Sequence, residues 1–322
     1  MSAAEDRTGW PEQPVLTEAD DGWHDHSPHW WETETAWFTF NVPERAMCGG
    51  LYVKARSVQE TCDGGAWVWD DSPVGARYDV QPTGLPFPNR GGDLRDLQAP
   101  NGVSITMLEP LMKYHTTYSD PGRFEADLVH EGIVAPHSHP IGAWPYWNSR
   151  HLDQTMHTTG MIVLDGEEIP IDSYTIRDRS WGPRPEGATP PEKKLERGAW
   201  QFNPKPPRAS LPYSIAYMYA AQDSQEAWLV GTSPLLENGE LSDEMDPGAG
   251  YLVRGGVYAP LVRAYRETEI DPERKWVRRV HIEGVDALDR SLSVDGELLS
   301  RWGEQDASGA GFFRWTWDGG CV

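Results

Sequence analysis

The chain has 322 residues, enough for two domains of ordinary size that each bury a hydrophobic core. A formal net charge of −22 argues against binding to nucleic acid, where Lys and Arg must neutralise phosphates, and against binding to an anionic membrane surface. Three cysteines without metal-ligand spacing predict no disulfide framework or zinc knuckle, and no apolar stretch approaches the roughly 20 residues of a membrane helix, so a soluble cytoplasmic protein is the default expectation.

Aromatic residues carry much of the apolar content, with 16 Trp, 12 Tyr and 7 Phe, and the chain is interrupted often by 32 Gly and 27 Pro. No long run repeats apolar residues at the i, i+3, i+4, i+7 spacing of an amphipathic helix. Short strands between frequent turns therefore predict an all-β protein.

Residues 1–30 are acidic and polar and contain proline, and we expect an extended segment that drapes over the first domain. Three of its histidines, His24, His26 and His29, have spacings that could hold a metal ion. The neighbouring Trp and Pro residues favour instead a segment packed against the mouth of a barrel, because short His tracts are only compositional hints.

Runs of branched and aromatic residues that are typical of strands follow from residue 36 onward. In the first half they are residues 36–42, 50–58, 65–70, 102–109, 112–118 and 123–130, and the proline- and glycine-rich residues 80–101 between them predict a long loop. A second loop, at 131–150, holds Trp144, Tyr146 and Trp147 and could serve as a lid over a cavity. His137 and His139 in that loop could be a pair of metal ligands, but no third or fourth ligand is evident, and we predict no metal site.

The segment 151–184 combines a hairpin pattern with many groups that can move protons. Residues 160–164 and 167–174 are typical of strands, and Asp165-Gly166 between them supplies the positive φ angles of a tight hairpin. If both flanks continue as strands, period-2 alternation sorts their side chains by face. On the first strand this alternation groups His151, Asp153, Thr155 and His157 against Leu152, Gln154 and Met156, and on the second it groups Ile176, Asp178 and Ser180 against Arg177 and Arg179.

His151 and Asp178 could then lie on neighbouring strands and face the same interior. An acid and an imidazole inside an aromatic-lined cavity can perform general acid–base catalysis. The alternative is structural: Asp178 would form an ion pair with its arginine neighbours that closes the end of a barrel, with Trp181 as an apolar plug.

The polar, proline-rich run after Arg184 is the best domain boundary in the chain. We predict a first domain at 31–185, a linker at 186–197 and a second domain at 198–322. Strands of the second domain are expected at 198–203, 212–221, 226–232, 251–257, 260–268, 275–283, 287–302 and 310–317. Residues 291–300 echo 161–170, with Asp-Gly between short apolar runs in each, which fits two similar β-barrels in tandem. The second copy lacks the Arg-Asp-Arg-Ser-Trp-Gly element, so we expect the chemistry in the first domain or at its seam with the second.

The sequence from Gly160 to Gly182, GMIVLDGEEIPIDSYTIRDRSWG, resembles the superfamily of carotenoid 1,2-hydratase (hydroxyneurosporene synthase) and AttH-like proteins. The resemblance implies two lipocalin-like antiparallel β-barrels side by side. It also implies a place among hydratases of isoprenoid and prenyl double bonds and relatives that catalyse cyclisations.

The family motif is similar to Tyr-His-Asp-His-x-Trp-Gly, and its aspartate is taken as the essential acid. That role carries over to Asp178, and Trp181 with Gly182 matches the end of the motif. A histidine in an upstream His-x-Trp element of the family matches His151. The chain departs from the pattern where Ile176 replaces the motif tyrosine, Asp153 replaces the tryptophan, and two arginines flank the aspartate.

Together these features predict a cofactor-independent hydratase or dehydratase that acts on a hydrophobic isoprenoid or aromatic molecule. A carboxyl group in an apolar barrel favours its protonated form, so Asp178 would deliver the proton and His151 or Asp153 would deprotonate the water. Substrate contacts are expected from Gln154, Tyr146, Trp147, Trp144, Tyr174, Trp181 and Arg177.

Two other functions stay open, an isomerase or pericyclase-like cyclase and a non-catalytic carrier of a hydrophobic ligand. No cofactor is expected, because the sequence has no nucleotide-binding glycine loop and no flavin motif. The predicted partner is a small hydrophobic substrate, without nucleic acid or membrane insertion, and the sequence leaves an oligomer open.

Overall fold

The computed structural model describes residues 9–12, 14–25, 30, 32–72, 76–138, 150–183, 218–231, 243–245, 247–273, 277–300, 303–305, 308–318 and 320–321. Within these ranges the chain is almost entirely antiparallel β-structure, which confirms the predicted fold class. Three short 3-10 helices, η1 (Glu18–Asp21), η2 (Pro43–Arg45) and η3 (Pro88–Gly91), complete the described elements. None of the helices in this part of the chain has the length and apolar character needed to cross a membrane.

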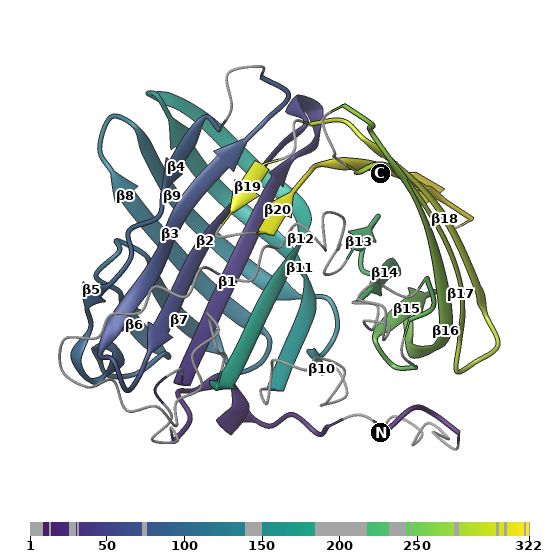
Figure 1. The fold of residues 1–322 in the computed structure, drawn as a ribbon, viewed down its shortest axis with the longest axis horizontal. Helices are drawn as coiled ribbons and strands as arrows, with labels where there is room; N and C mark the ends of the chain where they lie inside the picture. The colour runs from purple at the N-terminus through teal and green to yellow at the C-terminus, as the bar shows by residue number, and fades with distance from the viewer. Residues whose placement is uncertain are drawn as a thin grey trace.

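The first sheet contains 12 strands and curls around its own core (Figure 1). Its main path runs β4-β3-β2-β1-β12-β11-β9-β8-β7-β6, with β5 paired to β3 and β10 paired to β11. The strands are β1 (Glu32–Val42), β2 (Met47–Arg56), β3 (Thr61–Trp69), β4 (Tyr78–Val80), β5 (Leu85–Pro86), β6 (Asp96–Gln98), β7 (Ser104–Glu109), β8 (Lys113–Asp120), β9 (Phe124–Gly132), β10 (His137–Ser138), β11 (Arg150–Leu164) and β12 (Glu167–Pro183).

The second sheet contains 8 strands in the order β13-β14-β15-β16-β17-β18-β21-β22, and it arches beside the first (Figure 1). A separate pair, β19-β20, completes the list of described strands. These strands are β13 (Met218–Ala221), β14 (Glu226–Val230), β15 (Gly250–Arg254), β16 (Val257–Ile270), β17 (Val277–Asp286), β18 (Ser291–Leu298), β19 (Gly303–Gln305), β20 (Ser308–Ala310), β21 (Phe313–Trp317) and β22 (Gly320–Cys321).

Alternation along each strand places one set of side chains in a core. In β1, Ala36, Phe38, Phe40 and Val42 are buried in the core of the first sheet. The intervening Thr39 is on the other face, where its hydroxyl donates to the carbonyl of Ile176 at 2.8 Å. One core fills the first sheet and a second core, around Trp228 and Ile282, fills the second.

A third, smaller hydrophobic cluster joins the two sheets, and we call it the seam. It contains Ile176 from the first sheet and, from the second, Ala221, Ala227, Leu229, Tyr251 and Val253. The outer face of β12 is therefore covered by the second sheet, whereas the inner face of β12 belongs to the first sheet's own interior.

The β11-β12 hairpin matches its prediction. Asp165 and Gly166 form the turn with φ angles of 52° and 84°, the positive values that the dipeptide indicated. Both flanks continue as strands, so that β11 and β12 pair without a register shift from Arg150↔Trp181 to Leu164↔Glu167.

One expectation about elements was wrong. Residues 80–101 are not a plain loop, because β5, β6 and η3 lie within them. Asp295-Gly296 lies inside β18, within the strand predicted at 287–302, and a Cβ on Gly296 would come within 2.2 Å of the Trp315 ring. That glycine therefore permits close packing, and the echo with Asp165-Gly166 is one of sequence only.

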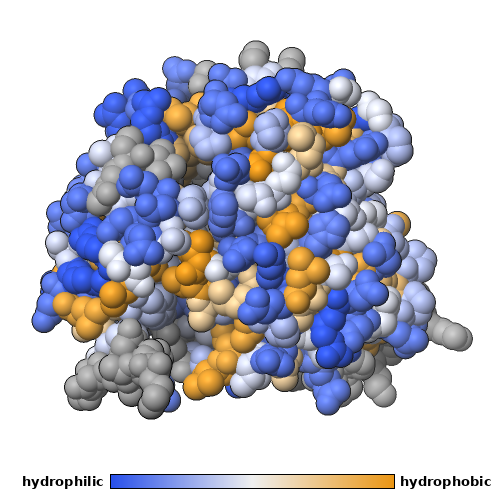
Figure 2. All heavy atoms as spheres, turned by 180° about the vertical axis from the view of Figure 1, so that it is seen from behind, coloured by the Kyte–Doolittle hydropathy of each residue, from blue (hydrophilic) through white to orange (hydrophobic). Residues whose placement is uncertain are grey.

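Several predictions fall outside the described residues: most of the lid at 131–150, the linker at 186–197 and the strand at 198–203. The described strands of the first sheet fall within 32–183 and those of the second begin at 218. The domain boundaries stay predictions. On the face seen in Figure 2, hydrophilic residues predominate and hydrophobic ones form only small groups between them.

Candidate functional site

Three adjacent strands bring polar residues to one row on the outer face of the first sheet. In the register of the sheet, His137 of β10 is opposite Asp153 of β11, which is opposite Asp178 of β12. Directly opposed residues of antiparallel strands project from the same face with their Cβ atoms about 5 Å apart. His151, two residues before Asp153, projects from that face as well.

His151, Asp153 and Asp178 meet, and we call them the triad. The Nε2 atom of His151 lies 3.1 Å from Oδ2 of Asp153 and 3.6 Å from Oδ2 of Asp178. One ligand atom from each residue lies within 4.8 Å of the others. Asp153 is fully buried, whereas the side chains of His151 and Asp178 remain 17% and 15% exposed, so a small molecule or ion can approach from their side. The predicted grouping of these residues is thus present in the structure.

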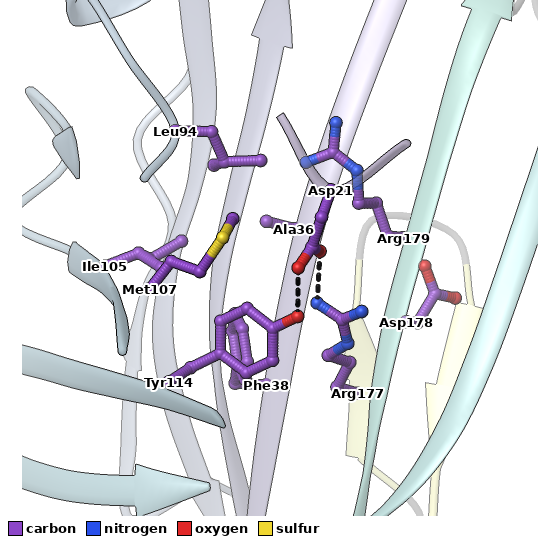
Figure 3. Close-up of a pocket in the computed structure, with 10 residues that line it drawn as sticks. All are labelled: Asp21, Ala36, Phe38, Leu94, Ile105, Met107, Tyr114, Arg177, Asp178 and Arg179. Atoms are coloured by element: carbon purple, nitrogen blue, oxygen red, sulfur yellow. Dashed lines mark hydrogen bonds and ion pairs between the residues drawn. The ribbon is translucent and has the colours of Figure 1, made fainter. Parts of the chain in front are cut away.

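The two arginines that flank Asp178 point to the opposite face of β12. Nη1 of Arg177 lies 2.7 Å from Oδ1 of Asp21, and Nη2 of Arg179 lies 2.8 Å from Oε2 of Glu34. Figure 3 shows the Asp178 carboxylate turned away from both guanidinium groups. The arginines therefore have their own carboxylate partners, and the structural alternative in which they pair with Asp178 is not what the geometry supports.

The N-terminal segment supplies Asp21 to the interior of the first sheet. Its carboxylate also accepts hydrogen bonds from the hydroxyl of Tyr114 and, at 2.6 Å, from the backbone N–H of Leu111. Burial acts to raise the pKa of Asp21, but the nearby Arg177 guanidinium and these hydrogen bonds outweigh it, and the net pKa is lowered. Burial also lowers the pKa of Arg179.

The cavity inside the first sheet beside Arg177 is too small for a substrate. The cavity beside Arg177 has a volume of about 10 Å³, enough for about one water molecule (Figure 3). Asp178 borders this cavity, but its carboxylate points away from it. The expectation that the acid and the imidazole face the interior of the first barrel is therefore corrected: they face the side of the sheet that carries the seam.

The remaining predicted substrate contacts divide between the two faces. Gln154 points inward, where its Nε2 donates to the carbonyl oxygens of Leu111 and Val134 at 2.8 and 2.6 Å. Trp181 lies on the arginine face and stacks on His24, with ring centroids 4.3 Å apart. Tyr174 lies on the triad's face and packs against the seam. Trp144, Tyr146 and Trp147 lie outside the described residues, as do His26, His29 and His139.

Several residues near the triad were not singled out from the sequence. Trp37, on β1, is the register partner of Asp178. The rings of Trp37 and Trp67 have centroids 6.2 Å apart, and both lie against Gly50, where a Cβ atom would clash with them. Alternation in residues 36–42 groups Trp37 with Thr39 and Asn41, but it cannot show that β1 pairs with β12.

The second sheet contributes two tyrosines next to the triad's strand. Tyr251 shares a 2.5 Å hydrogen bond with the hydroxyl of Thr155 and accepts one of 3.0 Å from the Thr155 backbone N–H. The hydroxyl of Tyr258 lies 2.8 Å from Nδ1 of His137, while Nε2 of His137 lies 2.8 Å from the carbonyl of Gly248. Burial raises the pKa of Tyr251, so its hydroxyl stays protonated at neutral pH. These contacts hold the second sheet against β10 and against β11, which carries His151 and Asp153.

Comparisons with known proteins agree with this architecture. A family model described as Domain of unknown function (DUF7064) matches residues 17–193, more than half of the chain. None of the curated proteins matches the chain in sequence.

Solved structures with a similar fold include a putative AttH from Nitrosomonas europaea, with 13% identity, a TM-score of 0.59, and coverage of 97% of this chain and 94% of that one. Kievitone hydratase from Nectria haematococca has 9% identity, a TM-score of 0.50, and coverage of 96% and 90%. CghA has 13% identity, a TM-score of 0.51, and coverage of 97% and 90%. At these identities the likeness shows the fold, and it confirms the predicted pair of lipocalin-like barrels.

Proposed function

Since the chain belongs to the DUF7064 family and has the AttH-like double-barrel fold, we propose that it is a hydratase or dehydratase that acts on a hydrophobic small molecule at the triad. The observation that carries the proposal is the position of His151 Nε2 between the carboxylates of Asp153 and Asp178, at 3.1 and 3.6 Å. The fold is similar to that of a protein named kievitone hydratase, and this similarity favours hydration over isomerisation or cyclisation.

The pair of carboxylates supplies the acid. Two carboxylates at directly opposed positions repel each other unless they share a proton or a cation. Sharing one proton leaves one of them able to protonate an alkene carbon, and Asp178 takes this role because it is the more exposed of the two. Trp37, its register partner, offers an aromatic ring to stabilise the carbocation that forms.

The other members of the triad complete the addition of water. Asp153 or His151 removes a proton from the water molecule whose oxygen forms the new C–O bond, and the cation is neutralised. Because His151 Nε2 contacts both carboxylates, it is placed to return that proton to Asp178, so that the net change is one water added to one double bond. The reverse sequence dehydrates a tertiary alcohol.

The test uses Asp178→Asn with a panel of prenylated aromatic and isoprenoid alkenes in ¹⁸O-labelled water. The wild-type chain should form an alcohol that carries the label, and the variant should bind the substrate but form product at least about 100-fold more slowly, as loss of a general acid predicts. Asp172→Asn is a matched control, since Asp172 is an exposed acid of the same strand and face. Equal rates in wild type and Asp178→Asn would refute the role of Asp178. Binding without turnover in the wild type would indicate a carrier, and an unlabelled isomeric product would indicate an isomerase.

A further inference from the structure

The triad combines one imidazole and two carboxylates, and this set of ligands suits a metal ion as well as a proton. Imidazole and carboxylate bind Zn²⁺ with bonds of about 2.0–2.2 Å, so a tetrahedral site places its ligand atoms about 3.3–3.6 Å apart. His151 Nε2 lies 3.1 Å from Oδ2 of Asp153, slightly below that range, and 3.6 Å from Oδ2 of Asp178, at its upper end. One ligand atom from each of the three residues lies within 4.8 Å of the others. We propose that His151, Asp153 and Asp178 form a binding site for a divalent transition-metal ion of the Zn²⁺ class.

The backbone around the triad holds the three ligands in place. Asp153 and Asp178 are register partners near the open end of the long β11-β12 ladder, and His151 belongs to the same ladder. Asp153 is fully buried, so few solvent molecules compete for its carboxylate, while the partly exposed His151 and Asp178 leave a path for the ion. Three protein ligands, found among the described residues, is the number in zinc sites that keep a water molecule at the fourth position.

Charge favours the ion over an empty site. Two ionised carboxylates and a neutral imidazole carry a charge of −2, which a divalent cation cancels and a single proton only halves. The expectation from the sequence that the chain binds no metal rested on the spacing of cysteines and histidines along the chain, which cannot reveal ligands that meet across a sheet.

A bound ion would occupy the carboxylate oxygens that the proposed acid step uses. Its bonds to Asp153 and Asp178 would take the place of a proton on those oxygens. This consequence for turnover rests on the proposed function, in which Asp178 needs that proton, whereas binding of the ion does not. A metal-loaded chain should therefore lose hydratase activity, and removal of the ion by a chelator should restore it.

The experiment titrates the full chain with ZnCl₂ by calorimetry, without substrate. We expect one site per chain, formed by the three residues of the triad. Asp153→Asn and Asp178→Asn should each weaken binding at least about 100-fold, the upper end of the loss seen when a residue that supports a metal ligand is replaced.

The control is the exposed pair that lies further along the same hairpin. His157 Nε2 lies 2.7 Å from Oδ1 of Asp172, with one imidazole and only one carboxylate, so His157→Gln should bind Zn²⁺ like the wild type.

Equal affinity in Asp178→Asn and the wild type would overturn the proposal, as would loss of binding in His157→Gln. Circular dichroism establishes that each variant is folded, and Asp178→Asn, at a partly exposed position, serves if Asp153→Asn does not fold. If Asp178→Asn keeps turnover but loses Zn²⁺ binding, the metal site stands and the proposed reaction falls. If Asp178→Asn loses turnover but keeps Zn²⁺ binding, the metal site falls and the proposed reaction stands.

Discussion

Alternation along β12 gives neighbouring residues entirely different environments. Asp178 faces the side of the sheet with the seam and joins the triad, while Arg177 and Arg179 face inward to Asp21 and Glu34. The inner pairs are almost fully buried, and a buried ion pair is costly to break because the remaining partner is left as an uncompensated charge. At the residue scale, Arg177 thus attaches the N-terminal segment through Asp21, and Arg179 attaches it through the carbonyl of Gly22. The aspartate between them belongs to the triad on the other face.

Asp21→Asn tests that attachment. Replacing the carboxylate leaves the guanidinium of Arg177 buried without a counter-charge, so we expect a loss of about 3–5 kcal/mol in the free energy of unfolding, measured by urea denaturation at neutral pH. Asp93→Asn is the control, because the Asp93–Arg95 pair is largely exposed and should change the free energy by less than about 1 kcal/mol. Similar losses in both variants would contradict the assigned role.

The same variant has a predicted pH dependence. The pKa of Asp21 is lowered in the folded chain, so the folded state binds fewer protons than the unfolded state in acid. The contribution of the ionised Asp21 to the free energy of unfolding is complete above the unfolded carboxyl pKa of about 3.9. It is lost as the pH falls through the lower pKa of the folded chain. The stability difference between wild type and Asp21→Asn should therefore be constant from pH 7 to 5 and should narrow below about pH 4.

The β11-β12 hairpin shows, at the scale of an element, what the sequence can and cannot predict. The Asp-Gly turn, the pairing of its strands and the grouping of His151 with Asp153 and of Ile176 with Asp178 all follow from local pattern. Period-2 alternation shows which residues share a face, but it does not show which face is the interior. That choice depends on distant partners, Asp21 for the arginines and Leu229 for the opposite face.

Two glycines of this hairpin should differ in the cost of an added methyl group. Gly166 has a φ of 84° and nothing within 4 Å of an added Cβ, so Gly166→Ala should cost only the strain of a left-handed backbone, about 1–2 kcal/mol. Gly160 has a φ of 141°, and its Cβ would lie 2.2 Å from the carbonyl oxygen of Asp127 on β9. Gly160→Ala must therefore also move backbone and should cost about 2–5 kcal/mol.

Urea denaturation of both variants gives the comparison directly. If Gly166→Ala proves the more destabilising, then the turn rather than the approach of β9 to β11 limits the hairpin. Equal costs would mean that β9 moves aside easily at Asp127.

At the scale of the whole molecule, the seam makes the two sheets depend on each other. Ile176 packs with buried residues of β13, β14 and β15, and Thr155 bonds to Tyr251 on β15. None of these pairings could be predicted from the sequence, because each joins segments that are separated by the linker region and no local pattern records them. They matter for the site, since Thr155 and Ile176 are the next residues on the triad's face along β11 and β12.

Leu229→Ala should therefore separate the unfolding of the two sheets. Leu229 is fully buried in the seam, and its truncation should cost about 2–5 kcal/mol and weaken the coupling between the sheets. In the wild type, tryptophan fluorescence and far-ultraviolet circular dichroism should report one urea transition, whereas in Leu229→Ala the two probes should report different midpoints. Leu292→Ala is the matched control, because Leu292 is equally apolar and buried but belongs to the second sheet's own core, so its transition should shift while the two probes stay coincident. Coincident midpoints in Leu229→Ala would show that the sheets are held together by contacts other than this cluster.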